Sequence, residues 1–564
     1  MVYPHIIPDI HEWPISKFDA IRQSFIDELN AFVLNKLETS HHNSFEDLLA
    51  KTIYLESQRA KNIPWKVDPQ DDLIYWRTMG QELNEALSAS NKNEALRNLV
   101  KRIINRYNEE IVGNFKPKTY KFARRFLTLL FKVIFNKFKD KGQGFFWGKR
   151  KDLVKNIQFS GYVDEVRDLF KKGTVVIVPT HFSNLDSIMI GAAVDFVAGL
   201  PAFAYGAGLN LYDVEIAAYF MNRLGAYRVD RRKKNPIYLE CLTSMVSYSL
   251  FKGVNNIFFP GGTRSRSGAI EDKLKLGLLG SVVDAQRLHI ENGSKEKIFL
   301  VPLVVSYHFV FEAGGLIEQH LQLIGKEKYS RTKQSGGAKM SKWDFVKSLF
   351  SKKSEVIMSF GEPLDALGNK VDSAGNSIDK HNNPIDISEY FILDGKITEN
   401  SQRENVYTKM IGDKIVQSFR VNNVVLSSHL VAFIAFQYLL RQRKDLNFFA
   451  ILRLHSKEFA LRLDVFKSLL SRAAEKLKEM EHNGLLRLSE QIHLPIDQLI
   501  EDGIYYLGTY HSESVLRIQN DFVLTDNIKL LYYYSNRLEG YDLEEKIEWD
   551  TIEEFKYLDK LEFD

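Results

Sequence analysis

Cysteine is nearly absent from this sequence, in which Cys241 is the only one among 564 residues. A single thiol excludes an internal disulfide framework and favours a reducing compartment. Long uncharged apolar runs are missing as well. The most apolar stretch, residues 421–440, contains two Asn, two Ser, one His and one Gln, so a buried helix is expected there rather than a membrane span. The first residues, MVYPHIIPDIHEWP, lack the basic start and apolar centre of a signal peptide.

Length and composition indicate a globular protein of several domains. One hydrophobic core rarely extends beyond about 250–300 residues, and apolar and charged residues make up 45% and 26% of this chain, as in folded proteins. We expect five segments: a helical region at 1–110, a basic membrane-contact segment at 111–155, a catalytic domain at 156–365, a polar linker at 366–400 and a mainly helical domain at 401–564.

Residues 116–150 differ in composition from their surroundings. They contain eleven Lys or Arg and one acidic residue. Their apolar side chains recur at helical spacing, at Phe122, Phe126, Leu130, Phe131, Ile134, Phe135 and Phe138. A basic helix with an aromatic stripe is typical of a helix lying in an anionic membrane surface; the alternative is a helix whose Phe stripe packs on the core. We expect a peripheral location at the cytoplasmic face of the membrane, without a transmembrane helix.

Short apolar runs alternate with helical segments between residues 160 and 365. Strands are predicted at 173–179, 201–206, 225–232, 256–262, 297–307 and 355–364, with helices at 185–194, 212–223, 237–251 and 274–288. This alternation predicts an α/β fold with a mostly parallel central sheet flanked by helices. Two stretches, 326–342 and 365–383, have the composition of loops.

The first of these strands leads into the strongest functional signal. Residues 173–179 are uncharged and rich in β-branched side chains, which predicts a buried strand. Ser183 and Asn184 are candidate helix caps, so His181 lies in the turn and Asp186 in the first helical turn. Ligands of such sheets bind beyond the carboxyl ends of the strands. The Asp can hold the imidazole while its other nitrogen takes a proton; the alternative is a capping Asp and an incidental loop His.

Arginines follow two other predicted strands. Arg231 and Arg232 come after the strand at 225–229, and Arg264 and Arg266 come after the run that ends in a Gly-Gly turn. One guanidinium group can donate two hydrogen bonds to the oxygens of a phosphate, and glycine lets the backbone approach a ligand. Each cluster alone is compatible with a solvated loop. Together, at strand ends beside a His/Asp pair, they predict a site for a small phosphate ester next to a general base.

Other kinds of chemistry are disfavoured. The Gly-Gly turn lacks the Gly-Lys-Ser/Thr of a nucleotide P-loop, so ATP or GTP hydrolysis is not expected. No serine elbow is present and Cys241 lies inside a helical segment well away from these turns, so no covalent nucleophile is expected beside them. Residues 502–525 predict two or three short strands after a helix, as in winged-helix modules. The strongly acidic tail that follows would repel phosphate, so no nucleic-acid partner is expected.

Four stretches occur in the order THFSNLD, GAYRVDR, FFPGGTRSRSG and VPLVVSY. They resemble the four blocks of the glycerolipid acyltransferases, the first of which is a His-x4-Asp motif. The downstream stretches LIEQHLQLIGKEK, SFGEPL and LLYYYSNRLEG are similar to the branch of large bacterial and mitochondrial glycerol-3-phosphate acyltransferases. The resemblance covers residues 160–365 closely and 400–540 loosely.

The resemblance implies a glycerol-3-phosphate 1-O-acyltransferase that makes lysophosphatidic acid in phospholipid biosynthesis. His181 is then the general base for the acceptor hydroxyl, and Asp186 orients it. The acyl donor is acyl-CoA or acyl carrier protein, and no cofactor or metal is implied. The substrate-binding residues implied by the same blocks are Arg231, Arg264, Arg266, Gly262, Thr263 and Pro302, with Gly225 helping to shape the floor.

One position departs from the family pattern. The family carries a glutamate after the place of Pro260, and this chain has Gly261. Glu271 or Asp272, in the predicted following helix, are candidates to replace it. His308 also stands where an acidic residue is expected. The departure leaves two alternatives open: another acceptor, such as lysophosphatidate or another lyso-lipid, or a catalytically weakened homologue that binds lipid or regulates.

Overall fold

The structure is a computed structural model that describes residues 2–40, 45–134, 157–209, 215–325, 355–455, 458–509 and 511–549. The basic segment is therefore described up to Ile134. The loop predicted at 326–342 and the end of the acidic tail lie outside the described residues.

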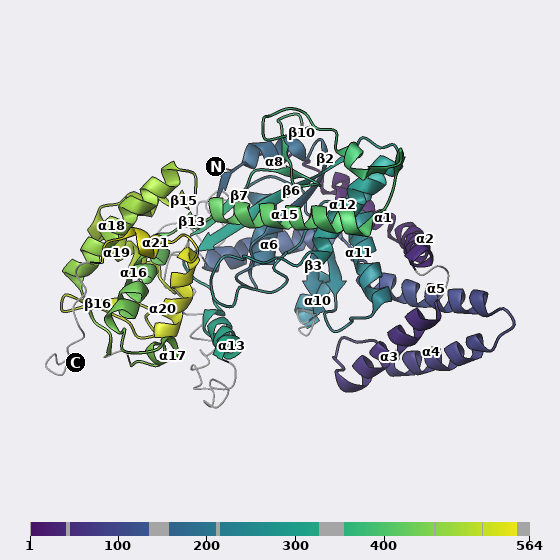
Figure 1. The fold of residues 1–564 in the computed structure, drawn as a ribbon, viewed down its shortest axis with the longest axis horizontal. Coiled ribbons are helices and arrows are strands. Elements are labelled where there is room, and N and C mark those ends of the chain that lie inside the picture. The colour runs from purple at the N-terminus through teal and green to yellow at the C-terminus, as the bar shows by residue number, and fades with distance from the viewer. Residues whose placement is uncertain are drawn as a thin grey trace.

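A ten-stranded sheet forms the centre of the molecule (Figure 1). The strands in the order β4-β3-β5-β2-β6 are all parallel. Strands β7 and β8 each pair antiparallel with β6, and β1 pairs parallel with β7. The predicted α/β fold with a mostly parallel central sheet is thus confirmed. The strands are β1 (Ile157–Gly161), β2 (Gly173–Pro179), β3 (Ala204–Gly208), β4 (Ala226–Val229), β5 (Asn256–Ile257), β6 (Lys297–Tyr307), β7 (Val356–Phe360), β8 (Leu364–Asp365), β9 (Lys370–Val371) and β10 (Ser377–Ile378).

Helices cover both faces of this sheet, and alternate strand residues belong to two separate cores. Val175 and Ile177 of β2 share a core with α8 and α9, whereas Val176 and Val178 share the other with α11 and α12. Side chains alternate between the faces of a strand, so a strand buried on both faces is apolar throughout. These helices are α8 (Val163–Leu169), α9 (Asp186–Phe196), α10 (Glu215–Met221), α11 (Pro236–Phe251), α12 (Gly277–Glu291) and α13 (Ala313–Gly325).

The N-terminal region is helical, as predicted. Its helices α2 and α5 pack against α11, and α3 and α4 form a hairpin at the edge of the molecule (Figure 1). The elements are η1 (Ile10–Glu12), α1 (Pro14–Ala20), α2 (Arg22–Ser40), α3 (Glu46–Asn62), α4 (Asp72–Leu87), α5 (Lys92–Ile111) and α6 (Pro117–Ile134).

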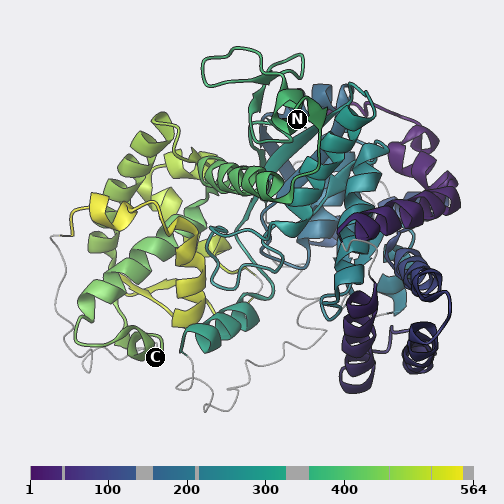
Figure 2. The ribbon, with the colours of Figure 1, turned by 45° about the vertical axis from the view of Figure 1, so that its right-hand side comes forward.

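The C-terminal helices lie on the opposite side of the sheet from this hairpin (Figures 1 and 2). The helices from α16 onward share one continuous core with the α9 face of the sheet, whereas α15 packs against α12 in the other core. The elements after β10 are η6 (Ile387–Phe391), β11 (Ile392–Leu393), β12 (Lys396–Ile397), α15 (Ser401–Val421), β13 (Val424–Val425), α16 (Ser427–Gln442), α17 (Phe448–Ile451), β14 (Leu461–Arg462), α18 (Leu463–His482), β15 (Arg487–Leu488), η8 (Glu490–His493), α19 (Ile496–Tyr506), β16 (Arg517–Gln519), β17 (Phe522–Leu524), α20 (Ile528–Ser535), η9 (Asn536–Leu538) and α21 (Leu543–Lys546).

Two sequence predictions for this part of the chain are confirmed. The apolar stretch at 421–440 contains most of α16, which is buried along nearly its whole length. Among the described residues, no helix is long and apolar enough to cross a membrane. The short strands predicted after the helix are β16 and β17, which form a small sheet with β14.

Residues 365–383 form three successive tight turns joined to β8, β9 and β10. In each turn an aspartate (Asp365, Asp372 or Asp379) accepts the backbone N–H and the side-chain amide of the asparagine four residues later. Asp and Asn side chains that bond their own backbone favour such turns. The loop-like composition of this stretch therefore has a local cause.

Candidate active site

The carboxyl ends of the parallel strands bring the predicted residues to one edge of the sheet. His181 follows β2, Arg231 follows β4, the Gly-Gly turn follows β5 and Tyr307 ends β6. Neighbouring parallel strands end on the same side, which is where α/β sheets bind their ligands. Four stretches that are distant in sequence therefore meet there.

His181 and Asp186 form a hydrogen-bonded pair in this edge. His181 Nδ1 lies 2.8 Å from Asp186 Oδ2. The Asp186 side chain is fully buried, and 18% of the His181 side chain is exposed. Asp186 Oδ2 also accepts the backbone N–H groups of Phe182 and Ser183 at 2.6 and 2.8 Å. With a carboxylate facing Nδ1, that nitrogen carries the proton and Nε2 is left to take another.

Tyr307 completes the support of this carboxylate. Its hydroxyl donates to Asp186 Oδ1 at 2.5 Å. Burial, and then the negative charge of Asp186, raise the pKa of Tyr307 well above its ordinary value, so the phenol stays a donor. Each carboxylate oxygen thus faces donors, and the imidazole is held in one orientation. This is the geometry that base catalysis requires.

The predicted helix caps at Ser183 and Asn184 are wrong, because both residues turn toward Glu312 instead. Ser183 Oγ donates to Glu312 Oε2 and the Asn184 N–H to Oε1, each at 2.9 Å. Helix α9 begins at Asp186, and its N-cap Leu185 makes no side-chain cap. Glu312 lies beyond β6 and was not predicted. Its Oε1 is also 3.5 Å from Arg264 Nη1, so it links the catalytic turn to the arginine turn.

Three predicted arginines gather beside the catalytic turn. Partial burial, and then the like charges of Arg264 and Arg266, lower the pKa of Arg231 from its ordinary value. Within the described part of the chain, neither Arg231 nor Arg266 has a carboxylate at ion-pair distance. Arg231 is exposed. Three guanidinium ions with one carboxylate partner between them, Glu312 beside Arg264, are suited to bind a phosphate.

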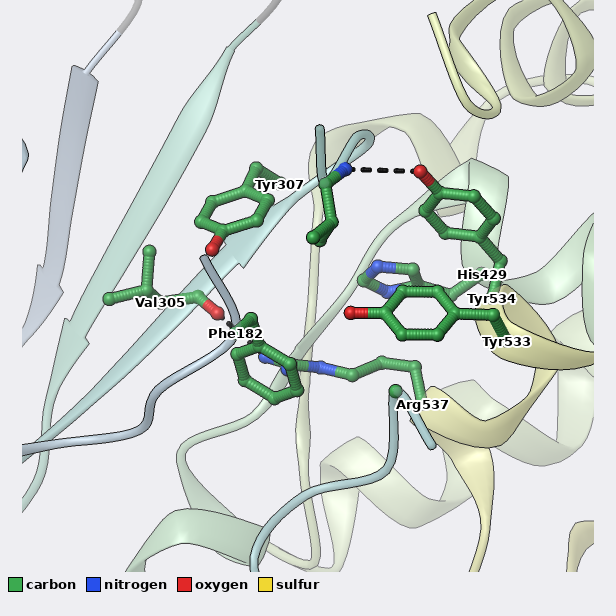
Figure 3. A pocket seen from close by; sticks show the side chains of 9 residues that line it. Phe182, Val305, Tyr307, His429, Tyr533, Tyr534 and Arg537 are labelled. Atoms are coloured by element: carbon green, nitrogen blue, oxygen red, sulfur yellow. Dashed lines mark hydrogen bonds between the residues drawn. The ribbon is translucent and has the colours of Figure 1, made fainter. Parts of the chain in front are cut away.

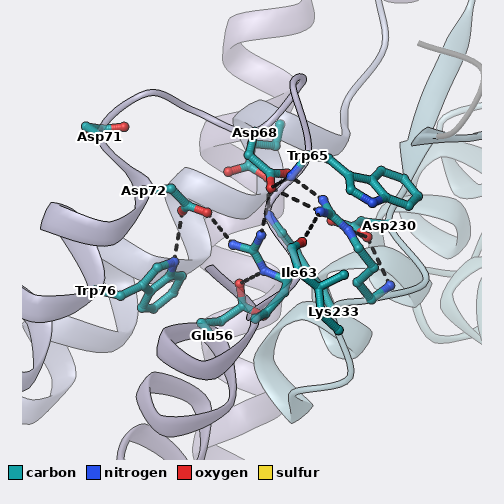
Figure 4. Close-up of polar contacts among 12 residues, drawn as sticks. Glu56, Ile63, Trp65, Asp68, Asp71, Asp72, Trp76, Asp230 and Lys233 are labelled. Carbon is teal, nitrogen blue, oxygen red and sulfur yellow. Dashed lines mark hydrogen bonds and ion pairs between the residues drawn. The ribbon is translucent and has the colours of Figure 1, made fainter. Parts of the chain in front are cut away.

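Arg232, which adjoins Arg231, has the opposite surroundings (Figure 4). It donates to Asp230 Oδ2 at 2.8 Å and to Asp68 Oδ2 at 3.0 Å, and lies over the ring of Trp65. Asp68 in turn accepts a hydrogen bond from Arg59, which also pairs with Glu56 and Asp72. Arg232 is therefore part of a paired network that joins the α3–α4 loop to the end of β4.

The other predicted substrate-binding residues are placed differently from one another. Gly262 has φ +70°, and a Cβ there would lie 2.5 Å from Cδ of Lys275, so the turn requires glycine. Thr263 lies between this turn and Arg264. Pro302 is buried within β6 opposite Val178, so it lies inside the sheet and not on the strand-end loops. Gly225 packs against the N-terminal helices, since a Cβ there would meet Ile15 at 2.3 Å.

The loop from residue 262 to 276 holds the backbone of His181. Glu271 Oε1 accepts the His181 N–H at 2.7 Å, and the Ser265 N–H donates to the His181 carbonyl at 2.7 Å. The Lys275 N–H bonds to the Pro260 carbonyl, which draws the loop across the strand ends. Helix α12 accordingly begins at Gly277, later than predicted, and Glu271 lies in the loop.

The C-terminal region forms the wall behind the catalytic turn (Figure 3). Arg537 of η9 lies 4.2 Å from the ring centroid of Phe182 and donates to the Val305 carbonyl at 2.8 Å. A cavity of about 20 Å³ remains between Arg537, Tyr307 and Tyr533. That volume suits a single water molecule, so it is not a substrate pocket. Arg537 stands in the predicted LLYYYSNRLEG stretch, but its partners could not be read from the sequence.

His308 faces this C-terminal region and not the catalytic turn. Its Nδ1 lies 2.7 Å from Ser428 Oγ, and its ring stacks on Tyr506. Among the described residues, no group of three His, Cys, Asp or Glu side chains could hold a metal ion.

Comparison with known proteins agrees with this geometry. Residues 158–306 match the family model described as Acyltransferase. Curated relatives include a glycerol-3-phosphate acyltransferase of Shewanella oneidensis, 25% identical over 263 residues, or 46% of this chain and 28% of that protein. Another, from Baumannia cicadellinicola, is 27% identical over 230 residues, or 39% of this chain and 24% of that protein. The matched segment thus spans about a quarter of the length of these relatives.

A solved structure also matches, the 1-acyl-sn-glycerophosphate acyltransferase PlsC of Thermotoga maritima. It is 12% identical, with a TM-score of 0.23, over 65% of this chain and 93% of that chain. The family match contains the His181 turn, both arginine turns and most of β6, so residues 158–306 of this chain are similar to the acyltransferase family.

Proposed function

We propose that this protein is a glycerol-3-phosphate 1-O-acyltransferase. The observation that carries the proposal is a buried Asp186 that orients His181 beside three arginines, of which Arg231 and Arg266 have no carboxylate partner among the described residues. A general base next to a cationic site fits an acceptor that joins a hydroxyl to a phosphate. Glycerol 3-phosphate has this chemistry, and it is named in the curated relatives.

The proposed reaction assigns a role to each of these groups. Arg231 and Arg266 hold the acceptor phosphate, with Arg264, which is paired with Glu312, beside them. His181 Nε2 takes the proton of the first hydroxyl as that oxygen attacks the carbonyl carbon of an acyl thioester. The carbon–sulfur bond breaks, and the departing thiolate of coenzyme A or acyl carrier protein takes up the proton. Asp186 stabilises the imidazolium that forms in between. No acyl-enzyme is formed, and Cys241 is buried in α11.

A direct assay tests this proposal. The full chain is incubated with palmitoyl-CoA or palmitoyl-ACP and glycerol 3-phosphate, and lysophosphatidic acid is measured by mass spectrometry. We expect product from the wild type and a loss of about 100- to 10,000-fold in kcat for His181→Ala. The absence of product with either donor, or full activity of His181→Ala, would refute it. Lysophosphatidate is offered in competition, and preferential formation of phosphatidic acid would assign the second acylation instead.

Membrane contact through α6 is a further part of the proposal. Arg124 is turned toward the protein and pairs with the buried Asp195, which pins the helix. Phe122 and Phe126 are 58% and 53% exposed, and Lys118 and other basic residues beside them are exposed too. Exposed aromatic rings between cationic side chains favour an anionic lipid surface, where the product lipid would be released.

Liposome flotation tests this contact. Full-length protein should bind vesicles that contain about 30% anionic lipid at low salt, with loss of binding at high salt. The Phe122→Ser/Phe126→Ser variant should lose binding, while Tyr54→Ser, which removes an exposed aromatic ring of the distant α3, serves as the matched control. Equal binding of both variants would contradict membrane contact through α6.

A further inference from the structure

Glu271 is a buried-carboxyl residue that the mechanism above does not use, and it contacts the main chain of the catalytic histidine. Its Oε1 accepts the His181 N–H at 2.7 Å. The same loop donates from the Ser265 N–H to the His181 carbonyl. Both polar backbone atoms of His181 are thus held by one loop. This loop follows β5 and contains Arg264 and Arg266.

The space for the Glu271 side chain exists because residue 261 is a glycine. A Cβ on Gly261 would lie 3.1 Å from Glu271 Cγ and 3.2 Å from Oε1. These distances are tighter than ordinary van der Waals contact, so side chains at positions 261 and 271 compete for one volume. Asp272, the neighbouring carboxylate, is exposed. The structure therefore distinguishes two residues that the sequence left as equal candidates.

The second carboxyl oxygen of Glu271 is held in an unfavourable setting. Oε2 is closed off from solvent and has no hydrogen-bond partner among the described residues. Burial raises the pKa of Glu271 to about 7, against the effects of the His181 N–H bond and of Arg537. The negative charge of Asp186, from α9, also contributes to this raised pKa. An apolar side chain would fill this volume at lower cost, so packing alone does not account for a carboxyl group here.

We propose that Glu271 is a positioning residue for His181. Its Oε1 fixes the main chain from which the imidazole projects. Its ionised form also stabilises the positive charge that the imidazole acquires when Nε2 takes the acceptor proton. The inference rests on the proposed function, because it assigns Glu271 to the same proton transfer. Arg537 on η9 and Asp186 on α9 are the other charged groups that face it.

The first test compares Glu271→Gln and Glu271→Ala with the control Asp272→Asn. We expect kcat to fall about 10-fold in the Gln variant, which keeps the acceptor oxygen, and about 100-fold in the Ala variant. The KM for glycerol 3-phosphate should stay within twofold, and Asp272→Asn should match the wild type. The deficit of the Gln variant should grow as the pH rises through 7 and vanish near pH 5.5, where Glu271 of the wild type is protonated.

Relocating the carboxylate gives a second, independent test. Gly261→Glu alone should lower kcat, because two side chains then occupy one volume. In the Glu271→Ala background the same substitution should raise kcat. This reversal of sign is not expected of a residue that only contributes to stability. Thermal unfolding of each variant separates loss of folding from loss of rate.

Failure of the proposed function and failure of the role assigned to Glu271 give different results. Absence of acyl transfer by the wild type refutes the proposed function, and hydrogen–deuterium exchange of residues 180–186 then decides the role of Glu271. Faster exchange in Glu271→Ala, but not in Glu271→Gln or Asp272→Asn, supports positioning, and equal exchange in all overturns it. In an active enzyme, wild-type kcat in both Glu271 variants, or a change confined to KM, overturns it as well.

Discussion

Arg231 and Arg232 are adjacent in the chain and belong to two charge clusters of opposite kind. Arg232 is paired with Asp68 and Asp230, and only 8% of its side chain is exposed. Arg231 is exposed and lies near Arg264 and Arg266, which share its charge. A cluster whose charges are paired internally needs no ligand. A cluster in which positive charges outnumber carboxylates, as around Arg231, is suited to bind an external anion.

The two clusters nevertheless depend on each other. The paired network attaches the α3–α4 loop to the end of β4 (Figure 4), and Arg231, the residue before Arg232, lies near Arg264 and Arg266. The N-terminal helical region therefore supports the position of Arg231, the arginine that we propose binds phosphate. Four experiments test whether the two clusters differ in this way.

Charge reversal in the unpaired cluster should have the largest effect. Arg231→Glu removes a cation and repels the acceptor phosphate, so kcat/KM for glycerol 3-phosphate should fall about 1,000-fold, or ~4 kcal/mol. The new carboxylate also relieves the repulsion among the arginines, so the Tm should not decrease. Steady-state kinetics and thermal unfolding measure the two quantities. A lower Tm with unchanged kcat/KM would assign Arg231 to the structural cluster.

Truncation in the paired cluster should act on stability. Arg232→Ala leaves Asp68 and Asp230 without their shared partner, so the free energy of unfolding should fall by about 3 kcal/mol. Chemical denaturation measures this, and Lys234→Ala, which removes an exposed cation of the same loop, is the control. If Arg232→Ala raises the KM for the acceptor and leaves stability intact, the distinction between the two arginines is wrong.

The pH dependence of stability should report on Asp68. Burial acts to raise its pKa, but the hydrogen bonds from Arg232 and from the Trp65 N–H outweigh this and hold it below the ordinary value. A depressed carboxyl pKa contributes stability above about pH 4, which is lost as the pH falls through the folded-state pKa. Asp68→Asn should therefore lower the free energy of unfolding by about 2 kcal/mol at pH 7.

The same difference should shrink as the pH falls below about 4. Denaturation curves of both proteins from pH 7 to pH 3 provide the comparison, with Asp47→Asn, which replaces an exposed carboxylate of α3, as the control. A difference that stays constant over this range would show that the Asp68 carboxylate is not what holds Arg232.

Salt should produce the smallest effect and separate the clusters once more. Raising NaCl from about 50 to about 500 mM shortens the Debye length from roughly 14 to 4 Å. The KM for glycerol 3-phosphate should rise about two- to fivefold, because the unpaired arginines are accessible to ions. The stability difference between wild type and Arg232→Ala should change little. An unchanged KM would argue against phosphate binding by exposed arginines.

Much of the fold could be predicted from local pattern. The run 297–307 forms β6 with the predicted bounds, and α11 begins one residue before the predicted start. Both are long segments with a clear period. Prediction was poorer at 256–262, where only Asn256 and Ile257 form a strand. Beyond them the chain bends into the loop that holds His181, and the bonds that cause this bend are not local.

The candidate site divides in the same way. The spacing of His181 and Asp186 was visible in the sequence, because a turn that joins a strand to a helix brings such residues together locally. The role of Glu312 was not, since its partners Ser183 and Arg264 come from other strand ends. Arg537 was part of a predicted stretch, but nothing near it in sequence indicates that it lies against Phe182.

The sequence alone was enough to predict most of the strands and the order of the turns that carry His181 and the arginines. It also showed the residue types needed for base catalysis beside a phosphate site. These properties follow from side-chain period and backbone preference, which act over a few residues. The tertiary structure was needed to show that Arg232 is paired with carboxylates, whereas Arg231 has no carboxylate partner among the described residues. It was also needed to show that Glu271 and not Asp272 reaches His181. Such choices depend on which distant side chain fills a given volume, and no local pattern records that.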